Sequence, residues 1–223
     1  MAWLLGHNPS AQVLCASYAQ DLADKHALDT RSVIASQLYR YIFPTRISRL
    51  KQAISEFTTN QGGRLATSVG GVLTGRGADL IIIDDPLKPE EALSGTQRKS
   101  TNDWYHHTLF SRLNDKRTGC IILIMQRQHE DDLVGHVQRI GEWKVLRFPA
   151  IAEEEERHTF ATFLGETRTY VRHPGELLHP EREPLGILEE LRQTLGEYNF
   201  SGQYQQAPAP FGGGMVKMAW FKS

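Results

Sequence analysis

The segment "LIIIDDP", Leu80–Pro86, decides the fold class of this 223-residue chain. Its continuous apolar run, Leu80–Ile83, is typical of a strand buried on both faces of a parallel sheet. The run ends at Asp84 and Asp85, and catalytic groups in such sheets gather at the carboxyl ends of strands. Two carboxylates there suit a site in which one holds magnesium through its water shell and the other orients or deprotonates a water. The alternative is that Asp-Asp-Pro only ends the strand with turn-forming residues.

The glycine-rich stretch "GGVLTGRG", Gly70–Gly77, nearly matches a phosphate-binding loop. Arg76 and Gly77 stand where that loop needs Lys and Ser/Thr, and the stretch leads into a strand instead of opening a helix. It is therefore not a Walker A loop. We predict a loop at the same edge of the sheet as Asp84.

Strands and helices alternate along the first two thirds of the chain, which predicts an α/β fold with a mostly parallel sheet flanked by helices. Ser17 is the expected N-cap of the first long helix, and His26 on its apolar face is expected to be a packed core histidine. The predicted strands are Gln12–Ala16, Leu80–Ile83, Cys120–Met125, Trp143–Phe148 and a hairpin around Asn60–Gly63; the predicted helices are Ala19–Leu38, Glu90–Asn114, Leu185–Leu195 and Tyr198–Gln206.

The composition changes along the chain and suggests four regions. Residues 1–149 carry the alternating core, and residues 150–184 are polar, acidic and broken by Gly and Pro, as in an irregular insertion with a small hairpin. Residues 185–206 read as C-terminal helices. Residues 207–223 are rich in Pro and Gly, like a linker.

Charge and cysteine content exclude several classes of protein. With 25 Lys+Arg against 26 Asp+Glu, the formal net charge of −1 gives no global basic field, so any contact with DNA must be local. Cys15 and Cys120 lie in apolar runs, as expected for reduced, packed thiols of a cytosolic protein. No apolar stretch approaches the length of a membrane span. Two basic clusters could touch phosphates or be ordinary solvated surface: Arg46, Arg49 and Lys51, and Arg112, Lys116 and Arg117.

Several long blocks resemble the ATPase half of the large terminase subunit of tailed double-stranded DNA bacteriophages, the motor that packages the viral genome. They are "LCASYAQDLADKHALDTRSVI", "RLATSVGGVLTGRGADLIIIDDPLKPEEA", "NDWYHHTLFSRLNDKRTGCIILIMQRQHEDDLVGH" and "YNFSGQYQQAPAPFGGGMVK". The similarity covers most of the chain and is weakest over residues 151–184. It implies a partial P-loop NTPase fold of the ASCE type.

The resemblance also implies roles for single residues. Asp84 falls on the Walker B aspartate that holds magnesium, and Asp85 falls on the catalytic carboxylate, which in such motors is more often Glu. Gln126 resembles the polar residue of the coupling motif that senses the γ-phosphate, with Arg127 as a weaker companion. A strand-end glutamine that simply meets solvent is the open alternative for Gln126.

The glycine-rich loop resembles the segment that presents an arginine finger in these motors. The resemblance makes Arg76 the candidate that neutralises charge on the transferred phosphoryl group, and Arg64 the second candidate. A surface arginine in a turn is the alternative reading of Arg76.

The resemblance implies ATP and magnesium as cofactors, and double-stranded DNA, the portal protein and the small terminase subunit as partners. It further implies a homo-oligomeric ring in the full-length protein, in the cytoplasm of a bacterial host, without a membrane. The family's Walker A loop and RNase H-like nuclease domain have no counterpart in the sequence, so we expect the chain alone to be inactive. Two alternatives stay open: a non-catalytic prophage remnant or interaction module, and a two-metal nuclease that uses Asp84, Asp85, Asp131 and Asp132.

Overall fold

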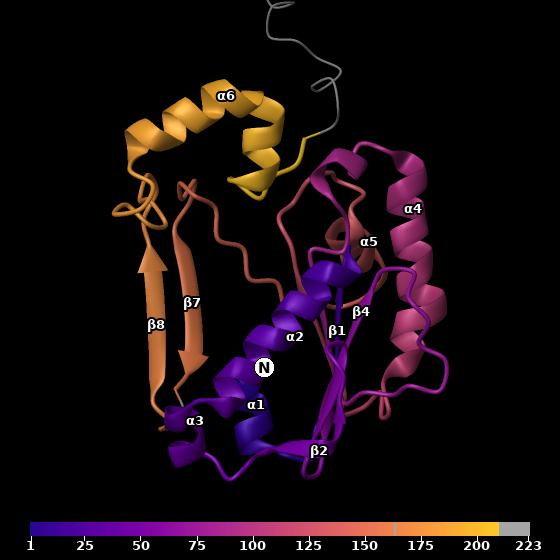
Figure 1. The fold of residues 1–223 in the computed structure, drawn as a ribbon. Coiled ribbons are helices and arrows are strands. Elements are labelled where there is room, and N and C mark those ends of the chain that lie inside the picture. Colours follow the sequence, from indigo (N-terminus) through magenta and orange to yellow (C-terminus); the bar gives the residue numbers. More distant parts are fainter. Residues whose placement is uncertain (163, 210–223) are drawn as a thin grey trace, which may run out of the picture. The chain divides into compact units, whose positions relative to one another are not determined.

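The computed structural model describes residues 1–162 and 164–209 (Figure 1). Contacts between residues divide the chain into two compact units, Met1–Met125 and Gln126–Ser223. The composition of the sequence changes later, after Pro149. Most of the expected linker, from residue 210 onward, lies outside the described residues.

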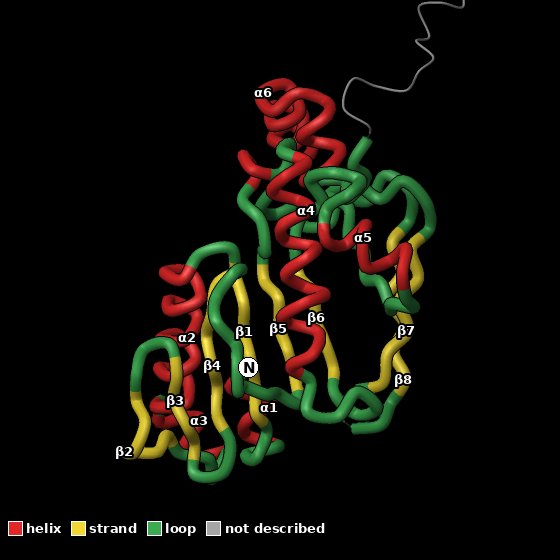
Figure 2. Tube along the Cα trace, turned by 90° about the vertical axis from the view of Figure 1, so that its right-hand side faces the viewer, coloured by secondary structure: helices red, strands yellow, loops and turns green. Residues whose placement is uncertain are grey.

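The first unit is built on a six-stranded sheet with the order β2-β3-β4-β1-β5-β6, which is visible in Figure 2. The strands β4, β1, β5 and β6 are parallel, while β2 and β3 join as antiparallel neighbours. The expected α/β class with a mostly parallel sheet is confirmed. The strands are β1 (Gln12–Ser17), β2 (Ile47–Gln52), β3 (Glu56–Thr59), β4 (Gly63–Ser68), β5 (Leu80–Asp84) and β6 (Cys120–Ile124).

Helices cover both faces of this sheet (Figures 1 and 2). On one face lie α1 (Ala2–His7), α2 (Gln20–Ala35) and α3 (Gln37–Ile42), and on the other lies α4 (Gly95–Trp104). The α1–α3 face is held by one apolar cluster that draws on all three helices and on the sheet. Its central members are Leu5, Val13, Ile34, Tyr39 and Phe57.

Small residues bring α2 close to the sheet. Ala23 and Ala27 lie one turn apart on α2 and pack with Ala66 of β4, and all three side chains are buried. Because no side chain larger than a methyl group separates helix and strand here, the height of α2 above the sheet is fixed within narrow limits.

Two helix predictions need correction. Ser17 does not cap α2: it is the buried last residue of β1, and α2 follows Ala19 without a side-chain cap. Helix α2 also ends at Ala35, because Ser36 is extended and caps α3 by accepting a hydrogen bond from Tyr39 N at 3.2 Å.

The helix expected over Glu90–Asn114 begins later than predicted. Ser94 caps α4 by accepting from Gln97 N at 3.4 Å, and the residues before it form only a short 3₁₀ turn. After Trp104 the helix continues as a π turn (Tyr105–Leu109) and a 3₁₀ turn (Phe110–Arg112).

The strand predicted at Trp143–Phe148 is wrong, because these residues form no strand. Val145 and Leu146 are half or more exposed, at 50% and 62%. A strand needs a neighbour for its backbone N–H and C=O groups, and this segment has none among the described residues. The hairpin expected around Asn60–Gly63 is confirmed by the antiparallel pair β3 and β4.

The second unit holds α5 (Leu133–Ile140), the hairpin β7 (Glu156–Ala161) and β8 (Thr167–Arg172), and α6 (Leu185–Gln203). The hairpin confirms the one expected in the insertion. The two expected C-terminal helices appear as α6, which is kinked at Gly196, where φ is 75°. Among the described residues, no helix is long and apolar enough to cross a membrane.

Candidate functional site

The carboxyl ends of the parallel strands form one rim, which backbone hydrogen bonds tie together. Val69 N donates to Ser17 O, Tyr18 N donates to Asp85 O and Asp85 N donates to Ile124 O, each at 2.9 Å. The strand β5, which ends in Asp84, lies between β1 and β6. The prediction that the acidic pair ends a central strand, beside the strand that leads to Gln126, is confirmed.

Asp84 is held from the side by a histidine of α2. His26 Nε2 lies 3.4 Å from Asp84 Oδ2, and the two side chains are 38% and 35% exposed. His26 is therefore not the packed core histidine that the helical pattern predicted. A carboxylate that is held at one oxygen and still open to solvent can bind a hydrated cation.

Asp85 has an unusual backbone conformation. Its φ of +43° is left-handed, and Pro86 follows it. Proline disfavours the right-handed helical region for the residue before it, and Asp is among the few residues that tolerate the left-handed one. Such a conformation costs about 1–3 kcal/mol and is typical of functional sites.

A pocket opens between α1, α2 and the sheet, and we call it the α1–α2 pocket. Its volume is about 420 Å³. The side chains of β1, β4 and β5 that line it all point to the face of the sheet that α2 covers. The lining residues are Met1, Ala2, Trp3, Cys15, Ser17, His26, Asp29, Thr30, Val33, Arg64, Ile82 and Asp84.

The structure places the two candidate arginines differently. Arg64 lines the α1–α2 pocket together with Asp84. Arg76 instead pairs with Glu56, Nη1 to Oε1 at 2.6 Å. Glu56 belongs to β3, which is three strands away from β5, or about 14 Å at the usual strand spacing. In this conformation Arg76 and Asp84 are not brought together.

The Gly70–Gly77 segment is a loop, as predicted, and no helix follows it. The loop leaves the rim after Ser68 and runs to the opposite end of the sheet. There Ala78 forms a bridge with Leu113, beside the amino end of β5. Its middle is fastened, because Arg112 Nη1 donates to Leu73 O at 3.1 Å and Leu73 is buried. Only the first part of the loop lies on the rim.

Gln126 is exposed and follows β6 by two residues, as the first residue of the second unit. Arg127 is a structural residue: its Nε lies 2.9 Å from Asp132 Oδ2, and Asp132 is fully buried. Asp132 also caps α5 by accepting from Gly135 N at 2.9 Å. Asp131 pairs with Arg139 at 2.9 Å.

One rim residue was missed in the sequence. Lys88 Nζ lies 5.6 Å from the centre of the Tyr18 ring, and Tyr18 N donates to the carbonyl of Asp85. Lys88 thus adds a positive charge to the segment that directly follows the acidic pair. Its position four residues after Asp84 was the available signal.

The residues fit magnesium only in one way. The described part of the chain contains no group of three or more His, Cys, Asp or Glu side chains suited to hold a metal ion. Magnesium, however, commonly keeps several waters and binds through one or two carboxylates plus a substrate phosphate. Asp84 and Asp85 suit that water-mediated mode and not a closed protein cage.

No protein-family model matches the chain, and no curated protein matches it.

Proposed function

We propose that the chain is part of the ATPase domain of a phage large terminase subunit, a P-loop NTPase that couples ATP hydrolysis to DNA packaging. The observation that carries this is the position of Asp84 and Asp85, at the carboxyl end of β5 between two parallel strands. Carboxylates at this point of a parallel sheet are placed to meet a ligand bound outside the strand ends.

Each acidic residue has a distinct part in the proposed reaction. Asp84, which His26 contacts, would hold magnesium through its water shell, and the ion would supply charge neutralisation at the phosphates. Asp85, displaced from the strand direction by its left-handed backbone, orients or deprotonates the attacking water. An Asp reaches less far than the more usual Glu, so its exact backbone placement matters more.

The outer edge of β6 supports the same proposal. No described strand pairs with that edge, and Ile122 and Ile124 are 41% and 52% exposed. In the proposed fold this edge takes up the strand that carries the Walker A loop, for which the 223 residues contain no G-x-x-x-x-G-K-[ST] sequence. Without its backbone cradle and lysine, the chain alone has little affinity for ATP.

A basic groove supports the proposed DNA partner. It lies between α2, α3 and β2, has a volume of about 640 Å³ and is lined by four arginines and no carboxylate. Arg40, Arg46 and Arg49 have no ion pair with any described residue. Arg46 donates to the carbonyls of Phe43 and Arg40 at 2.6 and 3.0 Å and so orders the groove. The portal, the small subunit and a homo-oligomeric ring in the host cytoplasm belong to the same proposal.

The test uses an extended protein, in which the chain is preceded by the upstream segment of its reading frame. We expect magnesium-dependent ATP hydrolysis by the extended protein. Asp84→Asn or Asp85→Asn should abolish it, and Asp103→Asn, at a half-exposed aspartate of α4 that pairs with Lys99, should leave it unchanged. The 223-residue chain should show no binding of a non-hydrolysable ATP analogue by calorimetry. Micromolar binding by the chain alone, lost on Asp84→Ala, would contradict the Walker A argument.

The alternatives give different results. A stop codon or frameshift directly upstream of Met1 would favour a non-catalytic prophage remnant. Metal-dependent DNA cleavage by the chain, lost on Asp84→Ala, would favour a nuclease. The structure disfavours Asp132 as a metal ligand of such a nuclease, because Arg127 and the backbone at the start of α5 already engage both of its carboxylate oxygens.

A further inference from the structure

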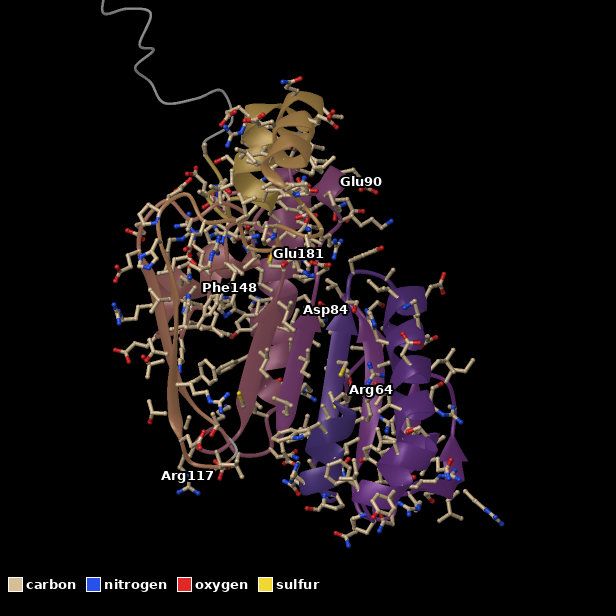
Figure 3. All side chains as sticks on the ribbon, turned by 90° about the vertical axis from the view of Figure 1, so that its left-hand side faces the viewer. Arg64, Asp84, Glu90, Arg117, Phe148 and Glu181 are labelled. Carbon is tan, nitrogen blue, oxygen red and sulfur yellow. The ribbon has the colours of Figure 1, made fainter. Side chains whose placement is uncertain are left out.

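The α1–α2 pocket contains a buried cation. Arg64 is only 4% exposed, and its Nε and Nη1 atoms have no hydrogen-bond partner among the described residues. An arginine stays charged in proteins. Figure 3 shows Arg64 further down the sheet than Asp84, which lies at the strand end.

The surroundings of Arg64 provide no counter-ion for this charge. Its neighbours across the sheet are Val13 on β1 and Phe57 on β3, and both are buried and apolar. Cys15 lies next along β1 on the same face; burial raises the pKa of its thiol, although the charge of Arg64 lowers it, so the thiol is neutral at pH 7. A buried, uncompensated charge destabilises the folded protein, and a bound anion would offset that cost.

Each carboxylate of the pocket lies beside a basic side chain other than Arg64. Asp84 pairs with His26, and Asp29 pairs with Lys25 Nζ at 3.0 Å. Along the strands Arg64 is level with Val13, four residues before Ser17, which is level with Asp84. That offset is about 13 Å along the strand direction. The arginine end and the acidic end of the pocket are therefore distinct.

We propose that the α1–α2 pocket binds a small oxyanion, a carboxylate or phosphate group of a small molecule, paired with Arg64. The volume of about 420 Å³ suits a small molecule, and Val33 and Ile82 give its body an apolar wall. The guanidinium supplies several N–H donors in one plane, which match the oxygens of either group. This site needs neither ATP hydrolysis nor DNA, so it goes beyond the proposed function.

Cys15 offers a direct readout, because it lines the same pocket and the chain has only one other cysteine. In a Cys120→Ser background, the rate at which iodoacetamide alkylates Cys15 is measured against inorganic phosphate and, separately, acetate and benzoate, with sodium chloride at matched ionic strength. We expect at least one series to slow alkylation several-fold and to saturate. Protection by phosphate alone, or by the carboxylates alone, assigns the chemical source.

Arg64→Met removes the charge at similar length and should abolish the protection. Arg117→Met, at an exposed arginine, should retain it. Since two nitrogens of the native guanidinium have no hydrogen-bond partner and no described carboxylate pairs with it, Arg64→Met should unfold at the same temperature as the parent or higher when no anion is present, while only the parent gains thermal stability from the anion. Saturable protection that is equal in the parent and in Arg64→Met would overturn the proposal, as would the absence of protection by every probe.

The anion site and the proposed ATPase activity can be tested independently of each other. Asp84→Asn should abolish hydrolysis in the extended protein and leave the protection of Cys15 by the oxyanion intact. If hydrolysis fails and protection persists, only the ATPase assignment falls. If Arg64→Met does not fold, Arg64→Lys replaces it. That variant should keep the protection of Cys15 but need a several-fold higher concentration of the same anion for half-maximal protection. An unchanged half-maximal concentration would contradict the proposed anion site.

Discussion

His26 Nε2 lies 3.4 Å from Asp84 Oδ2 and so joins the middle of α2 to the end of β5. The contact fixes the carboxylate that the proposed function assigns to magnesium. His26→Ala in the extended protein should raise the magnesium concentration needed for half-maximal hydrolysis and lower the rate about 10-fold, because a small displacement of a catalytic group is costly.

His26→Gln retains a hydrogen-bond donor and should restore most of the rate. Lys25→Ala, which removes the neighbouring exposed pair with Asp29, serves as the control. Stability should change by less than ~1 kcal/mol in all three variants, since both pairs are partly solvated. An equal loss of rate in the glutamine and alanine variants would argue against a positioning role.

Substitutions of Asp85 should affect activity far more than stability. Glycine adopts the observed φ of +43° without the steric cost, which opposes the loss of the interaction that the Asp85 side chain makes, so Asp85→Gly should change stability by less than ~1 kcal/mol while it abolishes hydrolysis. Asp85→Asn tolerates the same backbone and should keep the stability of the parent, also without activity. Urea denaturation and an ATPase assay on the same preparations measure both; a destabilised Asp85→Gly variant would show that the carboxylate itself supports the fold.

The two adjacent aspartates before α5 should differ sharply in their effect on folding. Asp132 is fully buried against Arg127 and caps the helix, so Asp132→Ala should cost about 3–5 kcal/mol. Asp131 forms a half-exposed pair with Arg139, and Asp131→Ala should cost less than ~1 kcal/mol. Denaturant titration compares the two; equal small costs would mean that the buried pair is not a stabilising unit.

The basic groove predicts a defined salt dependence of DNA binding. Arg40→Gln together with Arg49→Gln should lower the slope of log affinity against log salt by about 2, because each lost phosphate contact contributes about 0.9. Arg168→Gln, at an exposed arginine that pairs with Glu166, should leave the slope unchanged. Fluorescence anisotropy with a duplex at several salt concentrations gives both values. Equal slopes in the parent and the double variant would mean that DNA phosphates do not contact the basic groove.

The parts of the fold that could be predicted from sequence are those that local patterns determine. The run Leu80–Ile83 and the carboxylates after it specify both a buried strand and its functional end, and the Asn60–Gly63 turn specifies its hairpin. Trp143–Phe148 has an equally strong local pattern, yet it forms no strand, since pairing depends on a neighbour elsewhere in the chain. Local pattern cannot supply that neighbour.

The sequence predicted which site residues lie at the end of a strand, but not which side chains of different helices and strands contact each other. The Asp84 position follows from its place after β5, whereas its contact with His26 depends on how α2 crosses the sheet. Arg76 lies in a glycine-rich loop that suits an arginine finger, but its side chain forms an ion pair with Glu56 of a distant strand. Arg64 was considered only as a second arginine finger, because nothing in an alternating strand reveals that its guanidinium lacks a counter-ion.

The alanine contact between α2 and β4 has a consequence for how the site can vary. Ala23 precedes His26 by three residues and Ala27 follows it directly, so any side chain enlarged at Ala23, Ala27 or Ala66 would lift or tilt the helix that delivers the histidine. Such substitutions touch neither carboxylate. They would nevertheless change the position of His26 relative to Asp84. Related sequences could therefore differ in reaction rate through these three alanines while every acidic residue stays the same.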